Sequence, residues 1–359
     1  MGQITIVGAS LSGLSAASWL SNNGFRVKVF ERGSGIGHFR GQDFQVIRNY
    51  GADKGFCDSL KDYKIDIKHK QPINKIIKYA PSGRTMEVVA NGNPLFFVIK
   101  RGKSPLSLDS QIFNSINKNN LDLELNKTVN VLSGDIVATG PVLRNVFGVG
   151  YVFEGVDVNP EEIHLFMDNK YAPNGYIYVA PFGKDTLCIA AVSFDATFEL
   201  KMLLDRFLEK NEVVQELITN YSKKETFSGY GYCNYPETAE IDGKLFVGAA
   251  AGFVEAARGF GVKYAILSGL LAAESILTGK SYDSLWKGSF GNELKDSLYR
   301  HFLLSELTDS QYERLLSEEK VSVKEYKKIP SGLADLYKSI RFSQELKNWQ
   351  NQYSLHKLF

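Results

Sequence analysis

The chain has 359 residues, of which 44% are hydrophobic and 23% charged, the balance of a globular protein that can bury one large core or two smaller ones. Its net charge of +2 comes from 42 basic and 40 acidic residues, so no strong field points to nucleic acid as a partner. No apolar run approaches the roughly 18 residues of a membrane span and no secretory leader opens the sequence, so we expect a cytoplasmic protein.

The first predicted elements form a β-α-β unit around a glycine-spaced turn. Residues 4–7 predict a buried strand, residues 11–22 a helix and residues 26–31 a second strand. Gly8 permits the tight turn, and Gly13 lets the helix approach the strand closely. The N–H groups at the start of the helix then offer a site for a pyrophosphate.

Two residues bear on the nucleotide that this turn would hold. Glu31 ends the second strand, where an acidic side chain accepts hydrogen bonds from ribose hydroxyls. Ser10 replaces the middle glycine of the usual G-x-G-x-x-G, which predicts weakened or altered binding without abolishing it. A β-α-β unit with an empty nucleotide site is the alternative. These residues do not separate NAD from FAD, although the position at the start of the chain favours FAD.

The next stretch predicts a mixture of loops, short helices and one hairpin. Residues 31–43 form a glycine-rich loop that carries Arg40, and a short helix follows it. Residues 75–89 predict a hairpin turned by Pro-Ser-Gly. Ser107 and Asp109 come just before a helix. Two further strands are expected at 121–126 and 134–141, the second followed by a turn at a glycine.

The middle of the chain predicts an antiparallel sheet, and the end predicts helices. The expected strands are residues 150–158, 162–169, 175–183 and 186–194. An amphipathic helical stretch follows at 196–218, and residues 243–276 return to a strand, a glycine turn and a long small-residue helix. The segments that resemble parts of a nucleotide-binding domain are therefore separated in the sequence by a β-rich segment. This arrangement indicates a discontinuous cofactor domain.

Three of these stretches together resemble the geranylgeranyl reductase family of FAD-dependent oxidoreductases. The first is the glycine-spaced turn with Glu31. The second, residues 147–183, ends in YIYVAPFG and is similar to the family's Y-x-W-x-F-P-x-G motif. The third, residues 247–276, is similar to the family's V-G-D-A-A-G-F motif followed by G-x-G and a helix. The resemblance covers most of residues 1–280.

The resemblance implies an α/β fold like that of p-hydroxybenzoate hydroxylase. A Rossmann-like FAD-binding domain would carry an inserted antiparallel β-sheet substrate domain and a helical C-terminus. The expected divisions are 1–60, 101–145 and 226–281 for the FAD domain, 61–100 and 146–225 for the substrate domain, and 282–359 for the helical region.

The same resemblance assigns the cofactor contacts. They would be Gly8, Ser10, Gly13, Glu31, Arg32, Arg40, Gly41, Arg101, Ala249, Gly261 and Val262. The first four would hold the ADP half of FAD, and Arg40 and Gly41 would lie near the flavin. Gly261 and Val262 would face the flavin ring or the ribityl chain with backbone N–H groups, where a helix N-terminus stabilises negative charge.

Several positions depart from the family pattern. Gly41 and Gln42 replace the Cys-Gly pair of R-C-G-E-G, and Ala249 replaces an aspartate, which removes a hydrogen bond of about 1 kcal/mol. On the substrate side, Tyr178 replaces tryptophan and Ala180 replaces phenylalanine, which reshapes the pocket. The substrate residues implied by the resemblance are Tyr176, Tyr178, Ala180, Pro181 and Gly183.

The implied activity is reduction of carbon–carbon double bonds of a geranylgeranyl-type isoprenoid lipid by hydride transfer from reduced flavin. NAD(P)H or a reduced ferredoxin would supply the electrons. No group of His, Cys and Asp residues in the sequence identifies the proton donor. The candidates are Tyr176, Tyr178 and Cys188, each of which is equally well explained as an ordinary core residue. The cysteines and histidines show no metal-ligand spacing, so no metal site is expected.

Two alternatives stay open. One is a flavin monooxygenase-like or halogenase-like enzyme on the same fold. The other is a degenerate homologue that binds a lipid or a partner protein without flavin. The replacements at Ser10 and Ala249 support this alternative. The expected partners are a polyprenyl lipid, an electron-donor protein and a membrane surface. The membrane contact would involve residues 333–359, which mix apolar and basic side chains. Packing of a terminal helix onto the domain explains this mixture as well. The Lys, Ile, Asn and Tyr bias suits an archaeal source.

Overall fold

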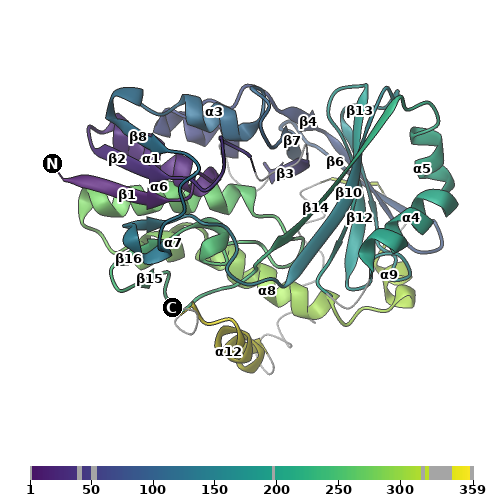
Figure 1. The fold of residues 1–359 in the computed structure, drawn as a ribbon. Helices are drawn as coiled ribbons and strands as arrows, with labels where there is room; N and C mark the ends of the chain where they lie inside the picture. The colour runs from purple at the N-terminus through teal and green to yellow at the C-terminus, as the bar shows by residue number, and fades with distance from the viewer. Residues whose placement is uncertain are drawn as a thin grey trace.

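The computed structural model describes residues 2–38, 43–49, 55–195, 199–316, 320–322 and 342–355. In these ranges the strands form a six-stranded, an eight-stranded and a three-stranded sheet. Figure 1 shows the six-stranded sheet with its helices on the left and the large sheet on the right, with the small sheet between them at the top. The expected fold class is confirmed: a Rossmann-like sheet with an added, mostly antiparallel sheet and C-terminal helices.

The six-stranded sheet holds the dinucleotide turn. Its strand order is β15-β16-β9-β1-β2-β8, and β1 pairs in parallel with both β2 and β9. The buried positions of β1, β2 and β9 are all Val or Ile. The strands are β1 Gln3–Val7, β2 Arg26–Phe30, β8 Leu121–Glu124, β9 Ile136–Val137, β15 Glu240–Ile241 and β16 Lys244–Phe246.

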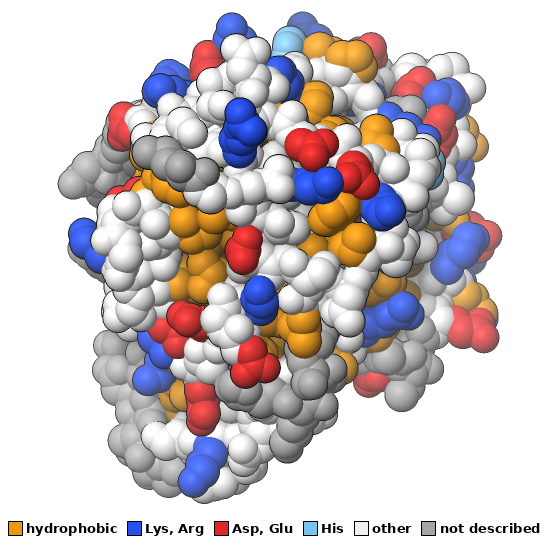
Figure 2. Space-filling view, turned by 60° about the vertical axis from the view of Figure 1, so that its left-hand side comes forward, with side chains coloured by type: hydrophobic (Ala, Val, Ile, Leu, Met, Phe, Trp, Pro, Cys, Tyr) orange, Lys and Arg blue, Asp and Glu red, His pale blue; other side chains and the backbone are white. Residues whose placement is uncertain are grey.

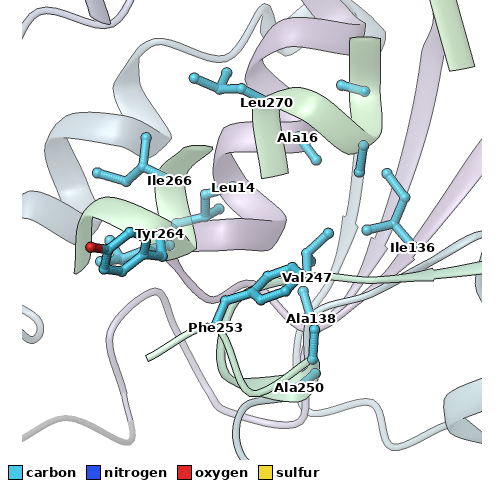
Figure 3. Close-up of a cluster of buried hydrophobic side chains, with 14 of the residues drawn as sticks. Leu14, Ala16, Ile136, Ala138, Val247, Ala250, Phe253, Tyr264, Ile266 and Leu270 are labelled. Carbon is cyan, nitrogen blue, oxygen red and sulfur yellow. The ribbon is translucent and has the colours of Figure 1, made fainter. Parts of the chain in front are cut away.

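Two helices from distant parts of the sequence share the core beside this sheet. The helices α1, Leu11–Asn22, and α6, Val262–Thr278, pack against each other and against β9. Figure 3 shows the cluster, with Leu14 and Ala16 from α1 beside Ile266 and Leu270 from α6. A Cβ at Gly269 would lie 2.1 Å from the carbonyl oxygen of Ser12, so the small residues of α6 set how closely the two helices approach.

The large sheet and the small sheet face each other across a second core. The large sheet has the order β14-β10-β13-β12-β11-β5-β6-β17, and the small one the order β3-β7-β4. The large-sheet strands are β5 Lys75–Tyr79, β6 Thr85–Val89, β10 Val146–Glu154, β11 Glu162–Phe166, β12 Gly175–Pro181, β13 Thr186–Ser193, β14 Lys223–Gly231 and β17 Lys320–Ser322. The small sheet consists of β3 Phe44–Arg48, β4 Gln71–Ile73 and β7 Phe96–Lys100.

The remaining helices cover the outside. Helices α4 and α5 lie on the far side of the large sheet, whereas α7 and α8 pack onto the core of the six-stranded sheet (Figure 1). Helix α12 contributes Leu346 and Trp349 to a cluster with Val146 and Leu298. The helices are α2 Phe56–Ser59, α3 Leu108–Asn114, α4 Leu200–Lys210, α5 Glu212–Leu217, α7 Tyr282–Trp286, α8 Asn292–Leu304, α9 Asp309–Leu315 and α12 Ser343–Gln352.

The surface carries charges of both signs. Figure 2 shows Lys, Arg, Asp and Glu side chains intermixed over one face, with hydrophobic side chains exposed between them. Within the described ranges, no helix combines the length and the hydropathy that a membrane span needs.

The structure departs from the expected elements at three places. The amphipathic stretch after the antiparallel strands is two helices, because Asn211 ends α4 and caps α5 by accepting a hydrogen bond from the Val214 N–H at 3.1 Å. The three strands of the small sheet, β3, β4 and β7, and the strands β14, β15 and β17 were not expected. The end of the described chain is also not wholly helical, since β17 pairs in parallel with β6.

Candidate active site

A cleft of about 580 Å³ opens at the carboxyl ends of β1, β2 and β9 and continues to the large sheet. Residues 7–12 and 138–141 line one end, and residues 227–231 of β14 line the other. Ligands of open α/β sheets bind outside the carboxyl ends of the strands, so this is the expected position for a dinucleotide.

The turn between β1 and α1 has the shape that the sequence predicts. Gly8 has φ +104°, and a Cβ there would lie 2.4 Å from the carbonyl oxygen of Ala138. A Cβ at Gly13 would lie 2.0 Å from the Gly8 carbonyl oxygen, so the helix starts directly against the turn. Ser10 caps α1: its Oγ accepts from the Gly13 N–H at 3.5 Å and lies 2.9 Å from Ser12 Oγ. The replacement of the middle glycine therefore keeps the helix start in place.

Glu31 braces the turn from the end of β2. Its Oε2 accepts from the Ala9 N–H and its Oε1 from the Gly33 N–H, both at 2.7 Å. Each carboxylate oxygen can accept a second hydrogen bond, so ribose hydroxyls fit at the same group. The exposed Arg32 lines the mouth of the cleft beside it. These residues fit the ADP half of a dinucleotide.

Arg101 lies at the base of the cleft in a buried ion pair. Its Nε and one terminal nitrogen donate to the two carboxylate oxygens of Asp109 at 2.8 and 2.9 Å, and the other donates to Gln45 Oε1 at 2.9 Å. Burial opposes the charge on Arg101, but the attraction of Asp109 outweighs it and the pKa of the guanidinium is raised. Gln45 in turn donates from Nε2 to Asp43 Oδ2 at 2.7 Å.

Strand β12 supplies two tyrosines to the far wall. Tyr176 OH donates to the carbonyl oxygen of Arg258, and Tyr178 OH donates to that of Phe44 at 3.3 Å. Burial is the main cause that raises the pKa of both phenols, the one at Tyr178 well above its usual range. Cys188 is fully buried outside the cleft lining, and burial raises the pKa of its thiol to about 12.

The loop before α6 closes this end of the cleft. Glu255 and Phe260 form an isolated antiparallel bridge, and Glu255 Oε1 pairs with Arg258 at 2.7 Å. Gly261 and Val262 follow directly, so the start of α6 faces the cleft together with Ala249. These three residues therefore line the same cleft as the dinucleotide turn.

The cleft does not contain every residue that the sequence singled out. Ala180 lies on the same face of β12 as Tyr178 but is covered by the small sheet, in one cluster with Phe44 and Val98. Pro181 and Gly183, at and beyond the end of β12, also lie outside the lining. Arg40 and Gly41 lie outside the described residues.

The cleft also includes residues that the sequence did not single out. They are chiefly Asp43, Gln45, Val46, Val192, Phe227, Tyr230 and Arg258. Strand β14 shows no strict alternation, because it is an exposed edge strand next to β10. Its contribution to the cleft depends on that pairing, which the local sequence does not encode.

Comparison with known proteins agrees with this geometry. A family model described as NAD(P)-binding Rossmann-like domain matches residues 6–56. The digeranylgeranylglycerophospholipid reductase 2 of Methanothermobacter thermautotrophicus is 30% identical over 165 residues, 42% of this chain and 40% of that protein. This chain is similar in sequence to geranylgeranyl-lipid reductases. The resemblance seen in the motifs is thus confirmed, and the match spans about two fifths of the length of that relative.

Solved structures extend the likeness of fold over nearly the whole chain. A geranylgeranyl bacteriochlorophyll reductase-like protein from Thermoplasma acidophilum has a TM-score of 0.74 at 20% identity, covering 97% of this chain and 100% of that chain. The flavin-dependent halogenase CmlS has a TM-score of 0.62 at 14% identity, covering 96% of this chain and 71% of that one. At these identities the likeness concerns the fold alone.

Proposed function

We propose that this protein is an FAD-dependent reductase that saturates carbon–carbon double bonds in the isoprenoid chains of a polyprenyl glycerophospholipid. The observation that carries the proposal is the continuity of the cleft, which joins a dinucleotide turn to an aromatic and aliphatic wall. Relatives named digeranylgeranylglycerophospholipid reductase support the lipid as the substrate class. The segments around the six-stranded sheet would hold the cofactor, and the large sheet would supply the substrate wall.

The chain's own residues would divide the work along the cleft. Bound FAD would supply the hydride. Gly8, Ser10 and Glu31 would hold its ADP half, and the start of α6 would face the ring. Val46 and Phe227 on the opposite wall would hold an apolar chain in line and exclude water.

The electrons and the lipid must both reach this site from outside. NAD(P)H or a reduced ferredoxin would supply the electrons, and peripheral contact with a membrane would supply the lipid. The side chain of Tyr230, 41% exposed at the cleft with the Arg144 guanidinium 3.8 Å from its ring centroid, offers an amphipathic edge for such contact.

The first test is the absorption spectrum of the purified protein, with the released cofactor identified by mass. FAD bands in near-stoichiometric amount support the proposal, and a colourless protein that does not take up added FAD contradicts it. The second test reduces the bound flavin without oxygen and adds a digeranylgeranyl phospholipid. Product lipids that gain two hydrogens per double bond support the reductase. Oxygen-dependent turnover of an aromatic substrate instead would identify a monooxygenase-like or halogenase-like enzyme.

A further inference from the structure

Asp43 is a buried carboxyl group in the lining of the cleft, and one of its oxygens has no hydrogen-bond partner among the described residues. It lies directly before β3, it is 8% exposed, and it belongs to the cleft lining. Its Oδ1 has no hydrogen-bond partner among the described residues. A buried polar atom without a partner costs about 1–3 kcal/mol, so such an atom in a cleft points to a ligand or to a proton that the group holds for one.

The surrounding network holds Asp43 in place and pairs the nearby Arg101 guanidinium with Asp109. Its carbonyl oxygen accepts from the Arg101 N–H at 3.0 Å, and its Oδ2 accepts from Gln45 Nε2 at 2.7 Å. The Arg101 guanidinium itself donates to Asp109 and Gln45. The side-chain hydrogen bond that Asp43 receives therefore comes from an uncharged amide, while the backbone of β3 and β7 holds the carboxyl in place.

We propose that Asp43 donates the proton in the double-bond reduction, an inference that rests on the proposed function. One alkene carbon would take the hydride from reduced flavin, which is thereby oxidised. The O–H bond of Asp43 would break as its proton forms the new C–H bond at the other alkene carbon. Asp43 would be left as a carboxylate and would regain a proton from water at the mouth of the cleft.

The tyrosines are weaker candidates for this role. Each of their hydroxyls already donates to a backbone carbonyl, Tyr176 to Arg258 and Tyr178 to Phe44. Burial raises the pKa of both phenols, and even an unperturbed phenol is a weaker acid than a carboxyl group by about 6 pKa units. Proton transfer is most efficient from a group whose pKa lies near the working pH, so the raised pKa of each buried phenol disfavours it as the donor.

Asp43→Asn tests the role, because it keeps the shape and removes the acid. We expect FAD content and affinity within about 3-fold of wild type, since the hydrogen bonds of Asp43 are to Gln45 and Arg101. Oxidation of the reduced flavin by the lipid in a single turnover should slow about 10²- to 10⁴-fold, the usual worth of general acid catalysis. Asp43→Glu should recover part of the rate. Asp205→Asn, which changes a half-buried carboxylate on α4 that pairs with Lys201 at 2.8 Å and accepts from Tyr151 OH, should leave the rate unchanged.

Infrared difference spectra give a readout that does not depend on turnover. The wild-type protein loaded with oxidised FAD should show a protonated-carboxyl band that Asp43→Asn lacks and Asp205→Asn retains. An unchanged single-turnover rate in Asp43→Asn overturns the inference and leaves the proposed function standing. Loss of FAD from Asp43→Asn, or a missing wild-type band, overturns it as well. A wild-type protein that holds FAD but reduces no lipid overturns the proposed function and this inference with it.

Discussion

Removing the Asp109 carboxylate should destabilise the protein strongly, because it leaves a buried guanidinium without its counter-charge. Asp109 is 2% exposed and accepts from Arg101 at 2.8 and 2.9 Å and from the Gly102 N–H at 3.1 Å. Arg101 is 5% exposed and would keep its hydrogen bond to Gln45. Breaking a buried pair by deleting one partner costs about 3–5 kcal/mol, so we expect this loss in the free energy of unfolding of Asp109→Ala, measured in urea.

The double variant separates the uncompensated charge from lost packing. Arg101→Met with Asp109→Leu removes both charges and refills most of the volume, and replacing a whole buried pair with apolar groups is often close to neutral. We expect it to regain at least about 2 kcal/mol over Asp109→Ala, a coupling that a double-mutant cycle measures. A loss below about 1 kcal/mol in Asp109→Ala would show that the unpaired guanidinium carries little energetic cost. A double variant as unstable as the single one would show that packing dominates.

Three further outcomes follow from the structure. Gly269→Ala should lower the free energy of unfolding in urea by about 1–3 kcal/mol, because its Cβ would lie 2.1 Å from the Ser12 carbonyl oxygen. Gly288→Ala is the control and should be neutral or slightly stabilising, because nothing lies within 4 Å of its Cβ. Equal effects of the two substitutions would contradict this. Burial lowers the pKa of His301 from 6.5 to about 4. Below pH 6.5 the unfolded chain therefore binds a proton that the folded chain does not. The free energy of unfolding should fall by about 2 kcal/mol between pH 7.5 and 5. His301→Phe should flatten that slope, and an unchanged slope would assign it to other groups. Glu31→Gln should weaken FAD binding about 10- to 150-fold in a fluorescence titration, because it removes one hydrogen bond to a charged group. Unchanged affinity would show that Glu31 does not contact the cofactor.

The sequence predicts best where local signals and tertiary structure agree. The unit over residues 4–31 combines β-branched strands, a glycine turn and a small-residue helix, and all of them form as expected. The hairpin over residues 75–89 forms with its turn at Gly83, which has φ +88°. In both cases a specific backbone shape requires a specific residue type.

The sequence predicts least where the position of a residue depends on partners that are distant in the sequence. Asp43 ends a glycine-rich stretch that the sequence predicts as a loop, and its hydrogen-bond partners are Gln45 on β3 and Arg101 just after β7, far away in the sequence. Ala180 follows a family motif, yet the small sheet that covers it went unpredicted, because its three strands are short and lie far apart in the sequence. Local patterns locate elements, whereas the residues that line a cleft depend on which elements meet.

The strand order of the six-stranded sheet has a consequence for synthesis of the protein. Strand β9 pairs with β1 on one side and with β16 on the other, and β16 ends at Phe246. At about 5–20 residues per second, roughly 5–20 s pass between translation of β9 and translation of β16. During that interval β9 would present an unpaired edge beside a half-built nucleotide turn, a feature that favours misassociation. The nascent chain should therefore be most dependent on chaperones before its second half has left the ribosome, and FAD should join it only afterwards.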